Sequence, residues 1–158
     1  MKVLIADDEP VSRRLLQSYL QKWGYEVVVA ADGSEAWRLF EAGDFPLVIS
    51  DWMMPGLDGP ELIAKIRSSA RGNYVYTILL TARAQKEDVV AGMEAGADDF
   101  LSKPFDRDEL RVRLRAGQRI IDLEQHLRET EAALAEQRKI VESLRQAGAS
   151  GREDEPQP

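Results

Sequence analysis

The chain has 158 residues, 44% of them hydrophobic, and a formal net charge of −7 at pH 7. This length suits one domain with an appendage, and the hydrophobic fraction is sufficient for a packed core. The negative charge argues against nucleic acid as a direct partner, because phosphate binding needs a local excess of Lys and Arg. The chain has no cysteine, which excludes disulfides and thiolate metal sites.

No targeting or membrane segment is evident. The first residues are apolar only as far as Ala6 and then meet the acids Asp7 and Asp8, so they are too short for a signal peptide. No later apolar run reaches the length that a membrane-spanning helix needs. We therefore expect a cytoplasmic protein that makes no membrane contact.

Short apolar runs alternate with amphipathic stretches along most of the chain. The runs are continuous, which is typical of strands buried on both faces. We predict strands at Lys2–Ala6, Glu26–Ala30, Leu47–Ser50, Thr77–Thr81 and Asp99–Ser102. Helices are predicted at Val11–Trp23, Ser34–Ala42, Pro60–Ser69, Lys86–Ala95 and from Arg107 onward.

Three of these helices begin with an Asp that is followed three residues later by a Glu. The Asp can cap the free N–H groups of the first turn, and the Glu lies at the positive end of the helix dipole. These pairs are Asp32/Glu35, Asp58/Glu61 and Asp106/Glu109.

The alternation of strands and helices predicts an α/β fold with right-handed crossovers. We expect a flavodoxin-like, doubly wound, five-stranded parallel sheet in the order 2-1-3-4-5. Ligands of such sheets bind beyond the carboxyl ends of the strands, where the first and third strands are neighbours.

Polar side chains stand at the ends of four predicted strands: Asp7 and Asp8, Asp51, Thr81, and Lys103. Each alone would be read as a helix cap, a turn former or a solvated charge. Together, three converging carboxylates need a cation, and all-oxygen ligands favour Mg²⁺. An ionised Asp51 could attack phosphorus without a base, while Lys103 and Thr81 stabilise the transferring phosphoryl group.

Four segments that contain these residues resemble the receiver domain of two-component response regulators, the family that includes the chemotaxis regulator. The segments are Val3–Glu9, Asp51–Gly59, Leu80–Ala82 and Gly96–Phe105. The resemblance implies a phosphoacceptor switch rather than an enzyme. A sensor histidine kinase or a phosphotransfer protein would phosphorylate it.

The resemblance also implies a role for individual residues. Asp51 corresponds to the phosphoacceptor and, with Asp8 and the Met53 carbonyl, to a direct Mg²⁺ ligand. Asp7 corresponds to the residue that holds a metal-bound water. Thr81 and Lys103 correspond to the pair that contacts the phosphoryl group. Further implied features are the switch aromatic, Phe100, and a cis bond between Lys103 and Pro104.

Two other classes of function are open to test from the sequence. A receiver followed by a coiled helix resembles the front end of larger signalling enzymes, so the chain could be an N-terminal regulatory fragment of a diguanylate cyclase or a phosphatase. A phosphatase of the haloacid-dehalogenase type is excluded, because it needs a second acid two residues after the nucleophile, where this chain has Met53.

Four arginines recur at every fourth position of the last helix: Arg107, Arg111, Arg115 and Arg119. Like charges at this spacing disfavour a helix by roughly 0.2–0.5 kcal/mol per pair. Two explanations stay open, namely local pairing with nearby acids and contact with an acidic face on a second copy. Binding of DNA is disfavoured, because no helix-turn-helix follows.

A heptad seam follows in the last helix: Ile120, Leu123, Leu127, Thr130, Leu134, Gln137, Val141 and Leu144. In a parallel dimer Arg119 would face Glu124 of the other chain, and His126 would face Glu131. We therefore expect a parallel homodimer, with a single solvated helix as the alternative. A downstream protein partner is also expected, although the sequence does not identify it.

The predicted organisation has three parts. Residues 1–119 form the receiver domain, and residues 120–147 form a coiled-coil helix continuous with the fifth helix. Residues 148–158 have no apolar face and are expected to be a disordered acidic tail.

Overall fold

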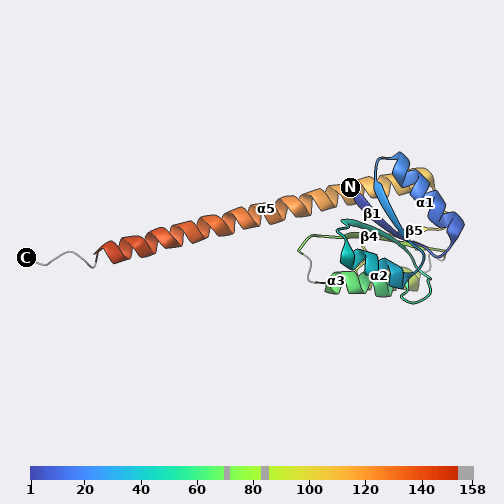
Figure 1. Cartoon of the computed structure of the whole chain (residues 1–158), viewed down its shortest axis with the longest axis horizontal. Helices are drawn as coiled ribbons and strands as arrows, with labels where there is room; N and C mark the ends of the chain where they lie inside the picture. Colours follow the sequence, from blue (N-terminus) through green and yellow to red (C-terminus); the bar gives the residue numbers. More distant parts are fainter. Residues whose placement is uncertain (70–71, 83–85, 153–158) are drawn as a thin grey trace, which may run out of the picture. The chain divides into compact units, whose positions relative to one another are not determined.

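The computed structural model describes residues 1–69, 72–82 and 86–152 (Figure 1). The strands are β1 Lys2–Ala6, β2 Glu26–Ala30, β3 Leu47–Asp51, β4 Tyr76–Thr81 and β5 Asp99–Ser102. The helices are α1 Pro10–Lys22, α2 Gly33–Ala42, α3 Gly59–Ser68, α4 Lys86–Glu94 and α5 Arg107–Arg152. These bounds match the predicted strands and the first four predicted helices to within one residue at each end.

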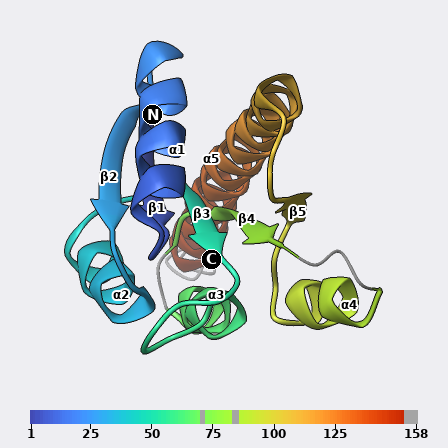
Figure 2. The same ribbon diagram turned by 90° about the vertical axis from the view of Figure 1, so that its right-hand side faces the viewer.

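The five strands pair in parallel in the order β2-β1-β3-β4-β5, which confirms the predicted flavodoxin-like topology. Figure 2 shows α1 and the beginning of α5 on one side of the sheet, with α2, α3 and α4 on the other. Each side has its own buried core. Leu16 and Leu110 belong to the core beneath α1 and α5, whereas Phe40 and Leu62 belong to the core beneath α2 and α3.

The helix starts are stabilised as predicted. The Asp58 side chain accepts a hydrogen bond from the Glu61 N–H at 2.8 Å, and the Glu61 side chain accepts one from the Asp58 N–H at 3.3 Å. Asp32 and Asp106 likewise accept hydrogen bonds from N–H groups in the first turns of α2 and α5. Each cap satisfies N–H groups that have no partner within the helix.

The chain divides into two compact units, Met1–Ile121 and Asp122–Pro158. The helix α5 continues to Arg152, which corrects the predicted helix end at Ala147. Gly148 and Gly151 each cost a helix about 1 kcal/mol relative to Ala, but unlike proline they keep the N–H donor, so the helix can continue through them. The rest of the predicted tail, residues 153–158, lies outside the described residues. None of the described helices is both long and apolar enough to cross a membrane.

Ser12 on α1 has a buried hydroxyl that finds no hydrogen-bond partner among the described residues. Burial without a partner costs the hydroxyl its hydrogen bonds to water, and Ser is also a poorer helix former than Ala. We expect Ser12→Ala to raise the free energy of unfolding by about 0.5–1.5 kcal/mol, measured by urea denaturation. Ser18→Ala changes an exposed position of the same helix and reports helix propensity alone. Equal gains in the two variants would contradict the desolvation argument.

Candidate functional site

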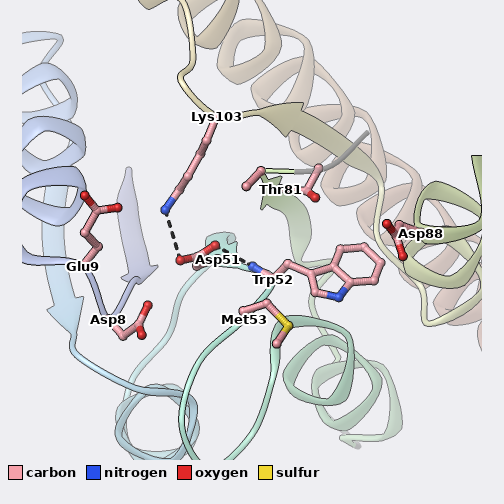
Figure 3. Close-up of a pocket in the computed structure, with 9 residues that line it drawn as sticks. Asp8, Glu9, Asp51, Trp52, Met53, Thr81, Asp88 and Lys103 are labelled. Atoms are coloured by element: carbon pink, nitrogen blue, oxygen red, sulfur yellow. Dashed lines mark hydrogen bonds and ion pairs between the residues drawn. The ribbon is translucent and has the colours of Figure 1, made fainter. Parts of the chain in front are cut away.

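A pocket of about 610 Å³ opens at the carboxyl edge of the sheet (Figure 3). Its walls come from the ends of β3 and β4 and from the segments that follow β1, β3 and β5, together with α4. The lining residues are Asp8, Glu9, Asp51, Trp52, Met53, Thr81, Ala82, Asp88 and Lys103. The pocket therefore lies where ligands of doubly wound sheets bind.

Asp7 lies beneath this pocket and is fully buried. Its backbone N–H extends the pairing of β1 by donating to the Ala30 carbonyl at 3.1 Å. One carboxylate oxygen accepts from the Glu9 N–H at 3.0 Å, and the other accepts from the Lys103 ammonium at 3.1 Å. Both oxygens are thus held by hydrogen bonds, as a buried carboxylate requires.

Asp51 is the last residue of β3, and its side chain is 13% exposed. Its Oδ1 accepts from the Trp52 N–H at 2.8 Å, and its Oδ2 accepts from the Lys103 ammonium at 3.0 Å. The start of α3 returns close to this residue, where a Cβ on Gly59 would lie 2.4 Å from the Asp51 carbonyl oxygen. Glycine at that position therefore allows the close approach of the two segments.

The charges at the site are unbalanced. Carboxylate oxygens of Asp7, Asp8 and Asp51 lie within 4.8 Å of one another, and one ammonium is shared by two of these acids. Burial raises the pKa of Asp51 to about 6, and Asp7 adds to the rise although Lys103 opposes it. Burial by itself would lower the pKa of Lys103, but hydrogen bonds and charge from Asp51 and Asp7 outweigh it and raise that pKa.

The donor set at this site fits a hard divalent cation. Every candidate side-chain ligand is a carboxylate oxygen, and Mg²⁺ and Ca²⁺ prefer such ligands. Asp8 is exposed and lines the pocket, whereas Asp7 is buried beneath it. Met53 also borders the pocket, with a side chain that is 73% exposed. The acidic cluster is therefore compatible with the predicted Mg²⁺ site.

Thr81 and Lys103 meet at the ends of neighbouring strands. Thr81 is the last residue of β4 and is 4% exposed. Its carbonyl accepts from the Lys103 N–H at 2.8 Å, so the backbone positions of the two residues are linked. The Lys103–Pro104 bond is cis, as the sequence resemblance implies.

Phe100 lies away from the pocket, in an apolar cluster with Trp52 and Leu79. The crevice that these residues line next to Thr81 has no room for a water molecule. The structure thus brings together Asp7, Asp8, Asp51, Thr81 and Lys103, and it places Phe100 in the layer beside them.

Two residues that line the pocket, Trp52 and Asp88, were not predicted from the sequence to be site residues. Trp52 follows the predicted acceptor and packs against α4, where a Cβ on Gly92 would lie 2.9 Å from its ring. Asp88 borders the pocket from the first turn of α4 (Figure 3). Acids are common in first helical turns, so only the packing of α4 beside the sheet reveals that Asp88 reaches this pocket.

The 2-1-3-4-5 sheet and the acidic cluster at its carboxyl edge define the class of chemotaxis-regulator-like receiver domains. Residues 3–115 match the response regulator receiver domain family. The chain belongs to this family.

Individual known proteins are also similar to the chain in sequence or in structure. The chain is 41% identical over 116 residues to the transcriptional regulatory protein TcrA of Mycobacterium tuberculosis, a match that covers 73% of the chain and 45% of TcrA. The chemotaxis response regulator CheY4 of Vibrio cholerae is 34% identical with a TM-score of 0.70, and the match covers 73% of this chain and 97% of CheY4.

A third match is the structure of a probable two-component system response regulator/GGDEF domain protein. It is 27% identical with a TM-score of 0.72, and the match covers 77% of this chain and 50% of that protein. The chain spans about half the length of the curated relatives it matches, between 44% and 51%.

Proposed function

We propose that this receiver accepts a phosphoryl group on Asp51 from a histidine kinase or a phosphotransfer protein, in a Mg²⁺-dependent reaction. Asp8, Asp51 and the Met53 carbonyl would bind the ion directly, and Asp7 would bind it through water. One observation carries the proposal: three carboxylates lie within 4.8 Å of one another, and a single lysine is paired with two of them. Such crowding of negative charges destabilises the native state unless a cation neutralises them, so it is typical of a site that binds a metal ion and a phosphoryl group.

The chemistry needs no general base. An ionised oxygen of Asp51 forms the new bond to phosphorus, while the bond from phosphorus to the histidine nitrogen of the donor breaks and leaves its electron pair on that nitrogen. Mg²⁺, when bound, supplies positive charge beside the phosphoryl oxygens. The Lys103 ammonium lies 3.0 Å from Asp51 Oδ2 and, after the transfer, would pair with a negatively charged oxygen of the phosphoryl group. Thr81 would donate its hydroxyl to a phosphoryl oxygen.

The signal would leave the site through Thr81 and Phe100. A shift of Thr81 toward the phosphoryl group would change the packing beside Phe100 and hence the surface near α4 and α5. The phosphoryl group need only stabilise one of two states that differ by a few kcal/mol. An unidentified downstream protein would recognise the changed surface.

The second unit would support a parallel homodimer. Its seam presents exposed apolar side chains, including Leu123 at 68%, Leu127 at 52% and Leu144 at 67% exposure. Pairing with a second copy would bury them, although the polar layers at Thr130 and Gln137 limit the strength of the coiled coil.

A second candidate is the regulatory fragment of a larger signalling enzyme, such as a diguanylate cyclase or a phosphatase. The observation in its favour is coverage, since the chain matches half of a response regulator/GGDEF domain protein and about half of its curated relatives. In either case the phosphoryl chemistry of the receiver would be the same. The length of the natural gene product distinguishes the two.

Incubation with acetyl phosphate and Mg²⁺, followed by intact mass measurement, tests the acceptor. We expect the wild type to gain one phosphoryl group, and we expect no gain for Asp51→Asn or for the wild type in EDTA. Asp88→Asn is the matched control, because it removes a carboxylate from the same pocket and should still gain the group. A wild type whose mass stays unchanged would contradict the proposal.

Light scattering on the same samples tests the parallel homodimer. A molar mass of one chain would contradict the coiled-coil proposal.

A further inference from the structure

Four exposed arginines on α5 form a row that we call the arginine strip: Arg107, Arg111, Arg115 and Arg119. All four belong to the first unit, Met1–Ile121. Within the described part of the chain, no ion pair joins any of them to a carboxylate. The local pairing that the sequence left open is therefore not observed.

Two arginines of the strip, Arg107 and Arg111, instead lie over aromatic rings at the end of α1. The guanidinium carbon of Arg107 lies 5.9 Å from the centre of the Tyr19 ring, and that of Arg111 lies 5.7 Å from the centre of the Trp23 ring. The two rings are stacked on each other with centres 5.8 Å apart. A guanidinium held over a ring keeps its N–H donors at its edge, so these two arginines are ordered and still able to bind carboxylates.

Two nearby acids, Asp99 and Glu109, pair with a different arginine of α5. Arg113 lies outside the strip and contacts both carboxylate oxygens of Asp99, at 2.9 and 2.8 Å. It also pairs with Glu109 at 3.2 Å. The charges of α5 are thus segregated, with paired groups around Arg113 and unpaired guanidiniums along the strip.

We propose that the arginine strip docks an acidic helix of a partner protein, one with carboxylates at every fourth position. Four residues of an α-helix rise about 6 Å, so such a row would match the spacing of the strip. Charge complementarity is the source of recognition, and each exposed pair contributes little by itself. None of the four arginines lines the pocket of Asp51, so binding at the strip can be tested separately from phosphoryl transfer.

The chain itself does not supply a matching row. No helix within the described residues carries two acids four positions apart, so no described helix of a second copy repeats carboxylates at the spacing of the strip. A nucleic acid is also a poor fit, because the net charge of −7 already includes the strip and would repel a long polyanion. A short helix with a few carboxylates avoids most of this repulsion.

Binding of a labelled peptide of Glu-Ala-Ala-Ala repeats to the full chain at low salt tests the proposal. We expect saturable binding by fluorescence polarisation that is lost at high salt and is weaker for a peptide with the same composition and no glutamates four apart. Arg111→Gln with Arg115→Gln should weaken binding about tenfold. The matched control removes two arginines from the second unit, with Arg138→Gln and Arg145→Gln, and should bind like the wild type.

Further measurements distinguish an acidic helix from the other ligands considered, a nucleic acid and a second copy of the chain. Circular dichroism would show whether Arg111→Gln with Arg115→Gln is still folded. If it is not, the variant Arg115→Gln with Arg119→Gln leaves both stacked arginines in place and should also weaken binding. Equal binding of the two peptides, or equal loss in the control variant, would overturn the proposal. Tighter binding of an oligothymidine would assign the strip to nucleic acid, and loss of self-association in the strip variant would assign it to a second copy.

Discussion

Asp98→Ala should lower the free energy of unfolding by about 2–4 kcal/mol. Asp98 is the centre of a polar network at the end of β4 opposite Thr81. Its Oδ2 accepts from Arg67 at 2.6 Å and from the Thr77 N–H at 2.7 Å, and the Tyr74 hydroxyl donates to its other oxygen. Removing the carboxylate would leave the partly buried Arg67 guanidinium without its counter-charge and the Thr77 N–H without its acceptor.

The rest of the network makes this loss hard to repair. Arg67 also donates to the Gly96 carbonyl at 2.9 Å and to the Val75 carbonyl at 2.6 Å. These bonds fix the guanidinium between α3, β4 and the segment before β5, so it cannot turn to solvent without breaking them. Because the side chains of Arg67 and Asp98 are 27% and 15% exposed, we place the cost below that of a fully buried pair.

Asp99→Ala is the matched control for Asp98. One guanidinium nitrogen of Arg113 donates to both carboxylate oxygens of Asp99. Because the Arg113 side chain is 35% exposed, the loss of this pair should cost about 1 kcal/mol or less. Urea denaturation of both variants provides the comparison. Similar costs for the two would show that the buried network is not the source of the stability. Since the network lies away from the pocket, folded Asp98→Ala should still accept a phosphoryl group.

Asp51→Asn should be more stable than the wild type in EDTA, by about 1–2 kcal/mol at pH 7.5. The pKa of Asp51 is raised from 3.8 to about 6, chiefly by burial. Between these two values the native state therefore holds more protons than the unfolded state, and its stability falls as the pH rises from about 4 to about 6. Above this window the cost is fully present. Asparagine removes it, so the variant should lose this part of the pH dependence.

Magnesium should reverse the order of the two proteins. The wild type should gain stability as Mg²⁺ is added, because a ligand that binds only the native state stabilises it. Asp51→Asn should gain much less. Urea denaturation in EDTA and in Mg²⁺, each at several pH values, measures both effects. Asp88→Asn removes a charge from the same pocket and should change stability by less than about 0.5 kcal/mol. An Asp51→Asn variant that is no more stable than the wild type in EDTA would contradict the crowding of the three acids.

Local features of the chain were predictable from the sequence alone. A strand buried on both faces needs a continuous apolar run, and a capping pair such as Asp58 and Glu61 acts within one helical turn. The parallel topology then brings the ends of β1, β3, β4 and β5 to one edge of the sheet. The grouping of Asp7, Asp51 and Lys103 follows from that topology, because each residue stands at or directly after a strand end.

Contacts between distant elements were decided by the tertiary structure. The arginine spacing on α5 indicated an unusual row, but only the packing of α1 on the same side of the sheet places Tyr19 beneath Arg107 and Trp23 beneath Arg111. In the same way, the partners of Asp98 come from α3 and β4, and Asp88 reaches the pocket through the placement of α4. Backbone spacing and hydrogen bonding are encoded within a few neighbouring residues, whereas the partner of a side chain depends on which elements the core brings together.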